Sequence, residues 1–446
     1  MKLTTPEKIR TLQRKLYVKA KREPRFRFYA LYDKIWRTDI LTHAYELVRS
    51  NGGAPGVDGK TFEAVEAGEG REEFVLDLQK QLKDKTYRAD AVRRVNIPKP
   101  QGGVRSLGIP TIRDRVAQMA AKMVIEPIFE ADFCDSSYGF RPKRSAHDAV
   151  EAVQNAMWSG YDQVIDADLS KYFDTIPHAN LLATVAERIS DGAVLALVKQ
   201  WLKAPVIEEN DKGKSRNAGG GKRNSRGTPQ GGVISPLLSN LYLHLLDRTW
   251  ERRRLNELYR TRLVRYADDL VILCAKEVDA PMARLRKILG KLDLKLNETK
   301  TGIVNAREET FDFLGFSFGL RRSRKSGKIY PHVEPSKKSV QRIKDKTREL
   351  TARPLTMLPM PYIIGQLNRT LRGWSNYFHW GNSTGVMSKV KWYVEGKVRT
   401  HLRKRHKLSS EAKAYRIFTA EVIYGRYGLY KLPTTAGWKK NAHART

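Results

Sequence analysis

Residues 262–274 read Arg262-Leu263-Val264-Arg265-Tyr266-Ala267-Asp268-Asp269-Leu270-Val271-Ile272-Leu273-Cys274, two apolar runs of strand length separated by two adjacent acids. This pattern predicts a β-hairpin that carries carboxylates at its turn. Adjacent acids between apolar strands are costly unless a cation lies beside them, and their oxygens suit Mg²⁺ bound together with substrate phosphates. We therefore expect a metal site at Asp268 and Asp269.

A two-metal site needs a further carboxylate, and the best donor lies in the upstream segment Gln163–Asp174. Alternation places Asp166 and Asp168 on one face of a predicted strand, and either could approach the hairpin turn. Two Mg²⁺ ions about 3.5 to 4 Å apart can activate a 3′-hydroxyl and stabilise a leaving pyrophosphate. The acids therefore favour polymerase chemistry.

The charge of the chain favours a nucleic-acid partner. Its 446 residues include 83 Lys and Arg against 48 Asp and Glu, a formal charge of +35, and the basic residues are interleaved with aromatic ones. No run of about 18 apolar residues could span a bilayer, and the first twenty residues lack the apolar core of a signal peptide. We expect no membrane partner and a location in the bacterial cytoplasm or nucleoid.

Several blocks resemble known proteins. Tyr266-Ala267-Asp268-Asp269, with Asp168 followed five residues later by Phe173, resembles the palm of reverse transcriptases. The surrounding sequence resembles the proteins encoded by group II introns, with matching blocks in the family's order over roughly residues 30 to 410. The blocks that carry this resemblance are Ser137–Ser145, Gly227–Pro236, Phe311–Phe316 and Leu367–Phe378.

The resemblance implies an α+β fold of the right-hand polymerase type, with antiparallel sheets in fingers and palm and an α-helical thumb. We predict a basic N-terminal extension with the first fingers loop at 1–60, fingers at 61–160, a palm at 161–320, a helical thumb or maturase domain at 330–410, and a basic, possibly DNA-binding region at 411–446. Within the palm, the basic, glycine-rich segment 208–226 is expected to be a flexible loop. A Cys- and His-bearing endonuclease domain is not recognisable, so priming would need a nick or a replication fork.

By the same resemblance, Asp168, Asp268 and Asp269 would be catalytic and would hold two Mg²⁺ ions. Asp166 remains the rival ligand, although only Asp168 has the family's spacing to Phe173. Lys300 would approach the pyrophosphate and act as general acid, while an ordinary surface lysine explains it equally well.

The resemblance also implies a set of nucleotide-binding residues: Lys99, Arg105, Arg141, Phe173 and Gln230. Lys99 and Arg105 lie in a predicted basic hairpin whose charges suit a triphosphate. The ring of Phe173 would exclude the ribose 2′-hydroxyl, unless it is an ordinary core residue. Arg141 could contact nucleotide or template.

Two further sets complete the expected sites. Phe313, Leu314 and Gly315 resemble the loop that grips the primer end. The basic faces of the predicted thumb helices suit duplex or structured RNA and supply the candidates Arg369, Arg372, Lys391, Arg399 and Arg403.

The expected function is RNA-directed DNA synthesis by the protein of a mobile group II intron, which extends a primer 3′ end on an RNA template and assists splicing as a maturase. Its partners would be intron RNA, a DNA target or primer, and deoxynucleoside triphosphates. A splicing-only maturase and a domesticated relative in repair or defence remain alternatives. The sequence leaves open whether the chain is a monomer or a dimer.

Overall fold

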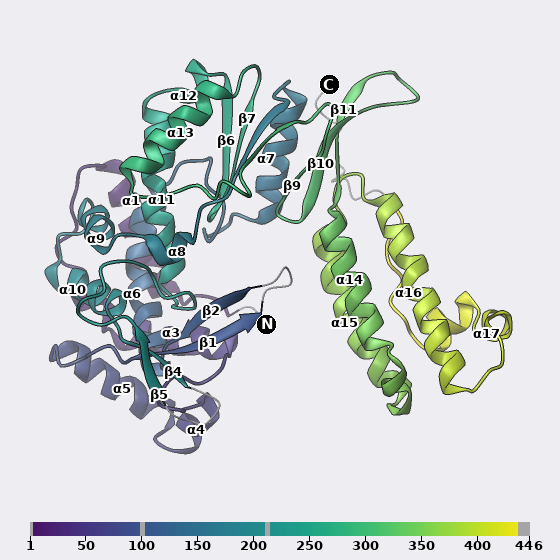
Figure 1. Ribbon diagram of the computed structural model, residues 1–446. Coiled ribbons are helices and arrows are strands. Elements are labelled where there is room, and N and C mark those ends of the chain that lie inside the picture. The colour runs from purple at the N-terminus through teal and green to yellow at the C-terminus, as the bar shows by residue number, and fades with distance from the viewer. Residues whose placement is uncertain (1–2, 99–102, 210–214, 436–446) are drawn as a thin grey trace. The chain divides into compact units, whose positions relative to one another are not determined.

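The computed structural model describes residues 3–98, 103–209 and 215–435 (Figure 1). The chain forms two compact units. Unit 1 comprises Met1–Ala149, Ala167–Leu270 and Asp279–Thr301, and unit 2 comprises Val150–Asp166, Val271–Val278 and Gly302–Thr446. No helix in the described part of the chain is long and apolar enough to cross a membrane.

Helix α6 (Ile112–Glu130) lies at the centre of unit 1, buried along most of its length. It begins where the Thr111 side chain accepts a hydrogen bond from the Asp114 N–H at 3.3 Å. It continues through Pro127 to Glu130 and packs against α1 (Glu7–Arg22) and α3 (Thr38–Asn51).

The remaining helices are mostly short. They are α2 (Tyr32–Ile35), α4 (Phe62–Ala67), α5 (Gly70–Lys83), α7 (Ala146–Trp158), α8 (Tyr172–Thr175), α9 (His178–Ala186), α10 (Gly192–Leu202), α11 (Ser235–Arg252), α12 (Leu255–Leu258) and α13 (Asp279–Lys291).

One sheet of unit 1 has the strand order β2-β1-β4-β5. Strands β1 (Val92–Pro98) and β2 (Val104–Ile109) form the predicted basic hairpin, β4 (Val206–Glu209) joins β1 in parallel, and β5 (Ser215–Gly219) pairs antiparallel with β4. The expectation of a loop throughout 208–226 is therefore wrong. Strand β5 pairs with β4, and β4 pairs with β1, so part of this segment belongs to a sheet through long-range pairing that composition does not reveal.

A second sheet has the order β6-β7-β3-β8 and carries the acids. Strands β6 (Thr261–Tyr266) and β7 (Asp269–Cys274) are the apolar runs on either side of the two adjacent acids, and they confirm the predicted hairpin. Strand β3 (Gln163–Ala167) pairs antiparallel with β8 (Gly302–Asn305). The mixed α+β class is thus confirmed, with one parallel pair, β1 with β4, among the antiparallel ones.

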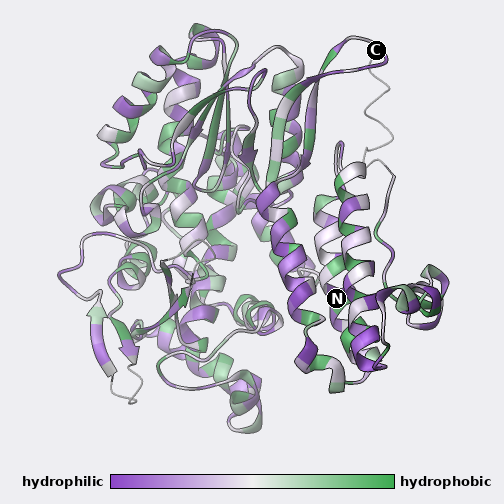
Figure 2. Ribbon diagram, turned by 45° about the vertical axis from the view of Figure 1, so that its right-hand side comes forward, coloured by the Kyte–Doolittle hydropathy of each residue, from purple (hydrophilic) through white to green (hydrophobic). Residues whose placement is uncertain are grey.

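Unit 2 contains the antiparallel meander β9 (Phe311–Phe313), β10 (Phe316–Arg322) and β11 (Ile329–Pro335). The helical part follows, with α14 (Lys337–Leu350), a 3₁₀ turn (Arg353–Met357), α15 (Met360–Phe378), α16 (Thr384–Arg405), α17 (Glu411–Ile417) and a π-helical turn (Val422–Arg426). Helices α14 to α16 each carry both hydrophilic and hydrophobic residues, as amphipathic helices do (Figure 2).

The predicted boundary at residue 410 does not separate two cores. Ala414, Phe418, Ile423, Leu429 and Leu432 are buried in the same apolar cluster as α15 and α16. The chain up to Leu432 is therefore part of the helical domain, and the rest of the predicted C-terminal region, from residue 436, lies outside the described residues.

Candidate active site

The main chain of Asp168 is held on both sides by the segment that follows α13. Its N–H donates to Oγ1 of Thr301 at 3.3 Å, and its carbonyl accepts from the N–H of Asn297 at 2.8 Å. The N–H of Ser170 donates to the carbonyl of Lys295 at 2.9 Å. These contacts leave the Asp168 side chain, 35% exposed, at the end of β3.

Asp268 stands in the turn between β6 and β7, directly after Ala267. Burial raises the pKa of the Asp268 carboxyl, and the negative charge of Asp168 raises it further, whereas the cations Arg105 and Arg265 lower it. Asp168 and Asp268 therefore lie within electrostatic reach of each other in a partly desolvated place. Such a pair of oxygen ligands suits hard divalent cations.

Lys300 is a direct neighbour of the acid pair. Its Nζ lies 3.5 Å from Oδ2 of Asp168, and its side chain is 61% exposed. The contact places an ammonium group at the edge of the site, within reach of a bound phosphate.

The other two acids are placed differently. Asp269, the first residue of β7, is exposed, and Asp166 is half-buried within β3. Among the described residues, no three acidic, histidine or cysteine side chains gather closely enough to hold a metal by themselves. Ions bound at Asp168 and Asp268 would share their coordination with substrate phosphates, as Mg²⁺ sites commonly do.

The basic hairpin meets the loop of Gln230 beside this site. Nε of Arg105 donates to Oε1 of Gln230 at 3.1 Å, and the N–H of Gly108 donates to the Gln230 carbonyl at 2.6 Å. Gly231 has φ +117°, and a Cβ there would lie 2.4 Å from the Gly108 carbonyl oxygen, so only glycine fits. Lys99, the other predicted cation, lies outside the described residues.

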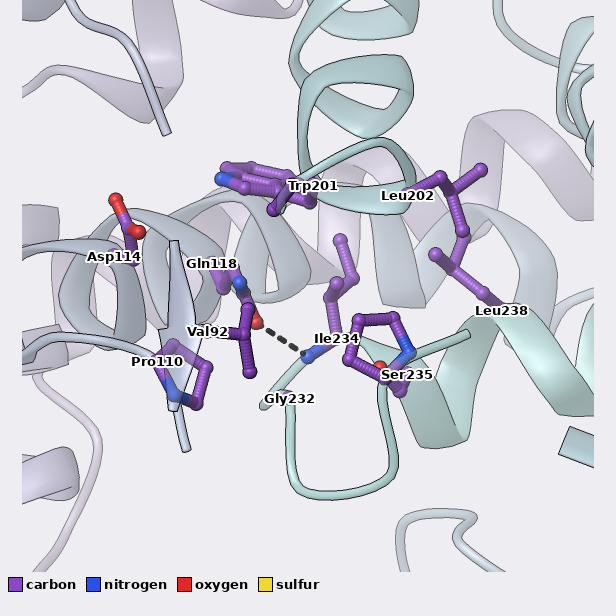
Figure 3. A pocket seen from close by; sticks show the side chains of 12 residues that line it. Val92, Pro110, Asp114, Gln118, Trp201, Leu202, Gly232, Ile234, Ser235 and Leu238 are labelled. Carbon is purple, nitrogen blue, oxygen red and sulfur yellow. Dashed lines mark hydrogen bonds between the residues drawn. The ribbon is translucent and has the colours of Figure 1, made fainter. Parts of the chain in front are cut away.

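Packing contacts hold the Gln230 loop in place. Figure 3 shows a small pocket where Ile234 of this loop and Ser235, the first residue of α11, face β1, α6 and α10. The N–H of Ile234 donates to Oε1 of Gln118 at 3.4 Å, the dashed line in Figure 3. The loop is therefore anchored on the core helix α6 and presents Gln230 from a fixed base.

Phe173 lies in α8 with 9% of its surface exposed. Its carbonyl accepts the N–H of Thr228 at 2.7 Å, which ties it to the start of the Gln230 loop. The neighbouring Tyr172 donates its hydroxyl to the Ser239 carbonyl at 2.6 Å, and the two rings meet edge to face with their centroids 5.5 Å apart. These contacts hold Phe173 in place beside the Gln230 loop.

Arg141 is not placed to bind a nucleotide. Its side chain is 4% exposed and forms an ion pair with Glu130 at 2.7 Å. It also donates to the carbonyls of Cys134 and Ser137, both at 2.7 Å. The prediction is corrected, because these acceptors engage the guanidinium in holding the loop between α6 and α7.

Two family models match this chain. Residues 97–318 match the model of the reverse transcriptase (RNA-dependent DNA polymerase) family, and residues 340–418 match the group II intron maturase-specific domain. The chain is 37% identical over 356 residues to Protein YkfC of Escherichia coli, covering 71% of this chain and 90% of that protein.

The chain belongs to the family of group II intron-encoded reverse transcriptases. It is 31% identical over 369 residues to the group II intron-encoded protein LtrA of Lactococcus lactis, covering 68% of this chain but only 59% of LtrA. A putative COX1/OXI3 intron 1 protein of Saccharomyces cerevisiae is 28% identical over 382 residues, covering 74% of this chain and 43% of that protein.

In the reverse transcriptase domain, sequence reasoning overlooked Arg265, which is wholly buried next to the turn of Ala267 and Asp268 and pairs with the carboxylate of Asp247. A charged residue inside the apolar run Leu263–Tyr266 was the signal that could have revealed it, because a buried charge needs a partner.

The predicted primer grip is the tight turn between β9 and β10 in unit 2. Leu314 and Gly315 both have positive φ, +50° and +80°. The Leu314 carbonyl accepts from the Tyr377 hydroxyl at 3.0 Å, and that of Gly315 accepts from the Ser339 hydroxyl at 2.8 Å. Phe313 is 3% exposed and belongs to the core, so Leu314 and Gly315 carry the accessible part of the turn.

The predicted RNA-binding residues of the maturase domain divide into two groups. Arg369 and Arg372 are exposed on α15, and Lys391 and Arg403 are half-exposed on α16. Arg399 is a correction. It is buried, donates to the Phe418 carbonyl at 3.0 Å and pairs with Glu395 at 3.2 Å, so it stabilises the core of this domain.

A basic turn between β10 and β11 was also missed. Five cations, Arg321, Arg322, Arg324, Lys325 and Lys328, occur in residues 320–330 without a single acid. The turn is ordered by hydrogen bonds from Ser323 N–H to the Lys328 carbonyl and from Gly327 N–H to the Ser323 carbonyl, at 2.8 and 2.9 Å. The dense run of cations in the sequence was the signal that could have revealed this turn.

Proposed function

We propose that this chain is an RNA-directed DNA polymerase of the right-hand type that extends a primer 3′ end on an RNA template. The observation that carries the proposal is the convergence of the half-buried Asp168, Asp268 and Gln230 with the exposed Arg105. The two carboxylates suit cations that accompany a triphosphate, and the fork of Arg105 suits the triphosphate itself. The reaction proposed for this arrangement is that of the reverse transcriptase family, to which the chain belongs.

The reaction joins the primer 3′-oxygen to the α-phosphorus of the incoming nucleotide and breaks the bond to pyrophosphate. Asp168 and Asp268, assisted by Asp269, would hold two Mg²⁺ ions. Bound Mg²⁺ would lower the pKa of the primer hydroxyl and neutralise charge on the leaving pyrophosphate.

The remaining side chains would bind and select the nucleotide. Arg105, with Lys99 from the same hairpin, would contact the triphosphate, and Gln230 would be freed from Arg105 to meet the nucleotide. Phe173 would close the space that a ribose 2′-hydroxyl needs. Lys300, 3.5 Å from Asp168, would donate a proton to pyrophosphate.

A second activity, assistance in splicing, is favoured by the maturase-specific domain and by the exposed cations of unit 2. Intron RNA would serve both as splicing substrate and as template, and a DNA target would supply the primer. Contact with RNA would run through Arg369, Arg372, Lys391, Arg403 and the basic β10–β11 turn, because phosphate contacts dominate RNA affinity.

Primer extension on an RNA template with deoxynucleotides and Mg²⁺ tests the proposal. The wild type should yield template-length cDNA, while Asp268→Ala should yield none and keep its affinity for the template–primer. Tight binding by the wild type without any product would contradict the polymerase assignment.

A further inference from the structure

Arg265 is the last residue but one of β6 and is wholly enclosed. It forms an ion pair with Asp247 of α11, and both side chains are 0% exposed. Nε of Arg265 donates to the two carboxylate oxygens of Asp247 at 2.9 and 3.1 Å. The positive charge of Arg265 is therefore balanced by the negative charge of Asp247 inside the fold.

The same guanidinium donates hydrogen bonds to three further groups around the turn of Ala267 and Asp268. Nη1 donates to Oδ1 of Asn240 at 3.0 Å and to the carbonyl of Ala267 at 2.9 Å. Nη2 donates to the hydroxyl of Ser137 at 2.6 Å. The carbonyl of Ala267 belongs to the peptide that leads into Asp268.

The residue before Asp268 adopts an unfavourable backbone conformation. Ala267 has φ +56°, in the left-handed region, which is unfavourable for a residue with a Cβ. The hydrogen bond from Arg265 to the Ala267 carbonyl stabilises this backbone conformation. Without this hydrogen bond, fewer contacts would fix the direction of the Asp268 side chain.

Stability alone is a weak reason for such a network. A buried ion pair loses much of its attraction to desolvation, and a well-packed apolar pair of similar volume often serves the fold equally well. An apolar pair could not hold the Ala267 carbonyl. The function of the arginine is therefore better sought in the turn than in the core.

We propose that Arg265 is a positioning residue for DNA synthesis, which sets the direction of the Asp268 carboxylate through the Ala267 carbonyl, with Asp247 as the anchor of its guanidinium. The proposal rests on the polymerase function proposed above. It assigns Arg265 no contact with substrate.

A neighbouring glycine offers an independent way to disturb the same peptide. The backbone of Gly139 lies against the turn, and a Cβ added there would lie 2.3 Å from the Ala267 nitrogen. Asn240 holds Gly139 in place by donating to its carbonyl at 2.5 Å. Gly139→Ala should therefore displace Ala267 while Arg265 and Asp247 remain intact.

The experiment compares Arg265→Lys, Asp247→Asn and Gly139→Ala with the wild type in single-nucleotide incorporation. Arg188→Lys is the matched control. Arg188 is also buried and pairs with a carboxylate, that of Asp132, at 3.3 Å, but it does not contact the turn of Ala267 and Asp268. All assays run well below each variant's unfolding midpoint. A second readout, without nucleotide, follows Mn²⁺ binding by the EPR signal of the free ion.

For the three turn variants we expect kcat to fall about tenfold to a hundredfold, as for a misplacement near 1 Å. KM for the nucleotide and RNA affinity should stay within about twofold, and Mn²⁺ binding should weaken. Arg188→Lys should lower the unfolding midpoint and leave kcat and Mn²⁺ binding unchanged.

The proposal is overturned if Arg265→Lys and Gly139→Ala keep wild-type kcat and Mn²⁺ affinity, or lose activity only as Arg188→Lys does. Failure of the polymerase function itself would be recognised separately, because the wild type would then give no product.

Discussion

Nζ of Lys300 lies 3.5 Å from Oδ2 of Asp168, and the segment that carries Lys300 also binds the Asp168 main chain through Asn297 and Thr301. One short stretch after α13 thus sets both the backbone of a predicted metal ligand and the cation beside it. This relationship supports the role that we propose for Lys300.

Replacing Lys300 by Gln should lower kcat for nucleotide incorporation about a hundredfold, because the proposed proton donor to pyrophosphate is removed. The free energy of unfolding should change by less than about 1 kcal/mol, since the ion pair is largely exposed. Single-turnover incorporation and thermal unfolding measure the two effects. Lys291→Gln, an exposed lysine at the end of α13, is the control. An unchanged kcat in Lys300→Gln would remove the residue from the mechanism.

Phe173→Val should admit ribonucleotides, because the smaller side chain opens the space beside the sugar. We expect the preference for dNTP over rNTP, as a ratio of kcat/KM, to fall at least about tenfold. Tyr172→Phe is the matched control. It keeps the adjacent buried ring and removes only the hydroxyl that donates to Ser239. Equal discrimination in Phe173→Val and the wild type would show that Phe173 is a core residue without a selective role.

Asp268→Ala should abolish cDNA synthesis but leave splicing assistance intact, because the acids lie in unit 1 and the maturase-specific domain at 340–418 lies in unit 2. A splicing assay with intron RNA, run beside primer extension, checks this separation. Splicing as poor as that of a variant with Arg369 and Arg372 changed to Gln would refute it.

Neutralising the basic turn through Arg322, Arg324, Lys325 and Lys328 should weaken RNA binding and make it less sensitive to salt. For every phosphate that the turn no longer neutralises, the slope of log affinity against log salt should become shallower by roughly 0.7 to 0.9. The control neutralises three exposed lysines in and after α5: Lys80, Lys83 and Lys85. Equal slopes for the turn variant and the wild type would rule out phosphate binding there. Weakening confined to DNA duplex would reassign the turn to the DNA partner.

Asp114 should make folding stability depend on pH. Burial raises the pKa of its carboxyl from 3.8 to about 6, despite the hydrogen bond from Tyr87. The folded state therefore binds the proton more tightly than the unfolded chain. The stabilisation that this proton gives is full below about pH 4 and is lost as pH rises through 6.

Asp114→Asn cannot titrate, so the stability of the wild type relative to this variant should fall by on the order of 2 kcal/mol between about pH 4 and pH 7. Urea unfolding of both proteins across this range measures the difference. A difference that stays constant, or one that grows with pH, would contradict the raised pKa.

Local patterns were enough to predict the elements nearest the chemistry. The two apolar runs on either side of Asp268 and Asp269 predicted the β6–β7 hairpin, because this pattern depends on neighbouring residues alone. The same is true of the β1–β2 hairpin that carries Arg105.

Long-range contacts explain most of what was missed. Nothing in the composition of 208–226 reveals that β4 would pair with β1. Arg141 and Arg399 resemble free surface cations in the sequence, yet the fold buries them against Glu130 and the Phe418 carbonyl, respectively. The network of Arg265 joins residues from three separated segments, and a single sequence gives the charge without its partners.

The most direct test of the central claim is single-turnover incorporation of one deoxynucleotide on an RNA template–primer, compared between the wild type, Asp168→Asn and Asp268→Asn. The proposed site predicts rapid addition by the wild type and a decrease of at least about a thousandfold in both variants, with template–primer affinity unchanged. Incorporation by either variant at the wild-type rate would show that the chemistry lies elsewhere in the chain.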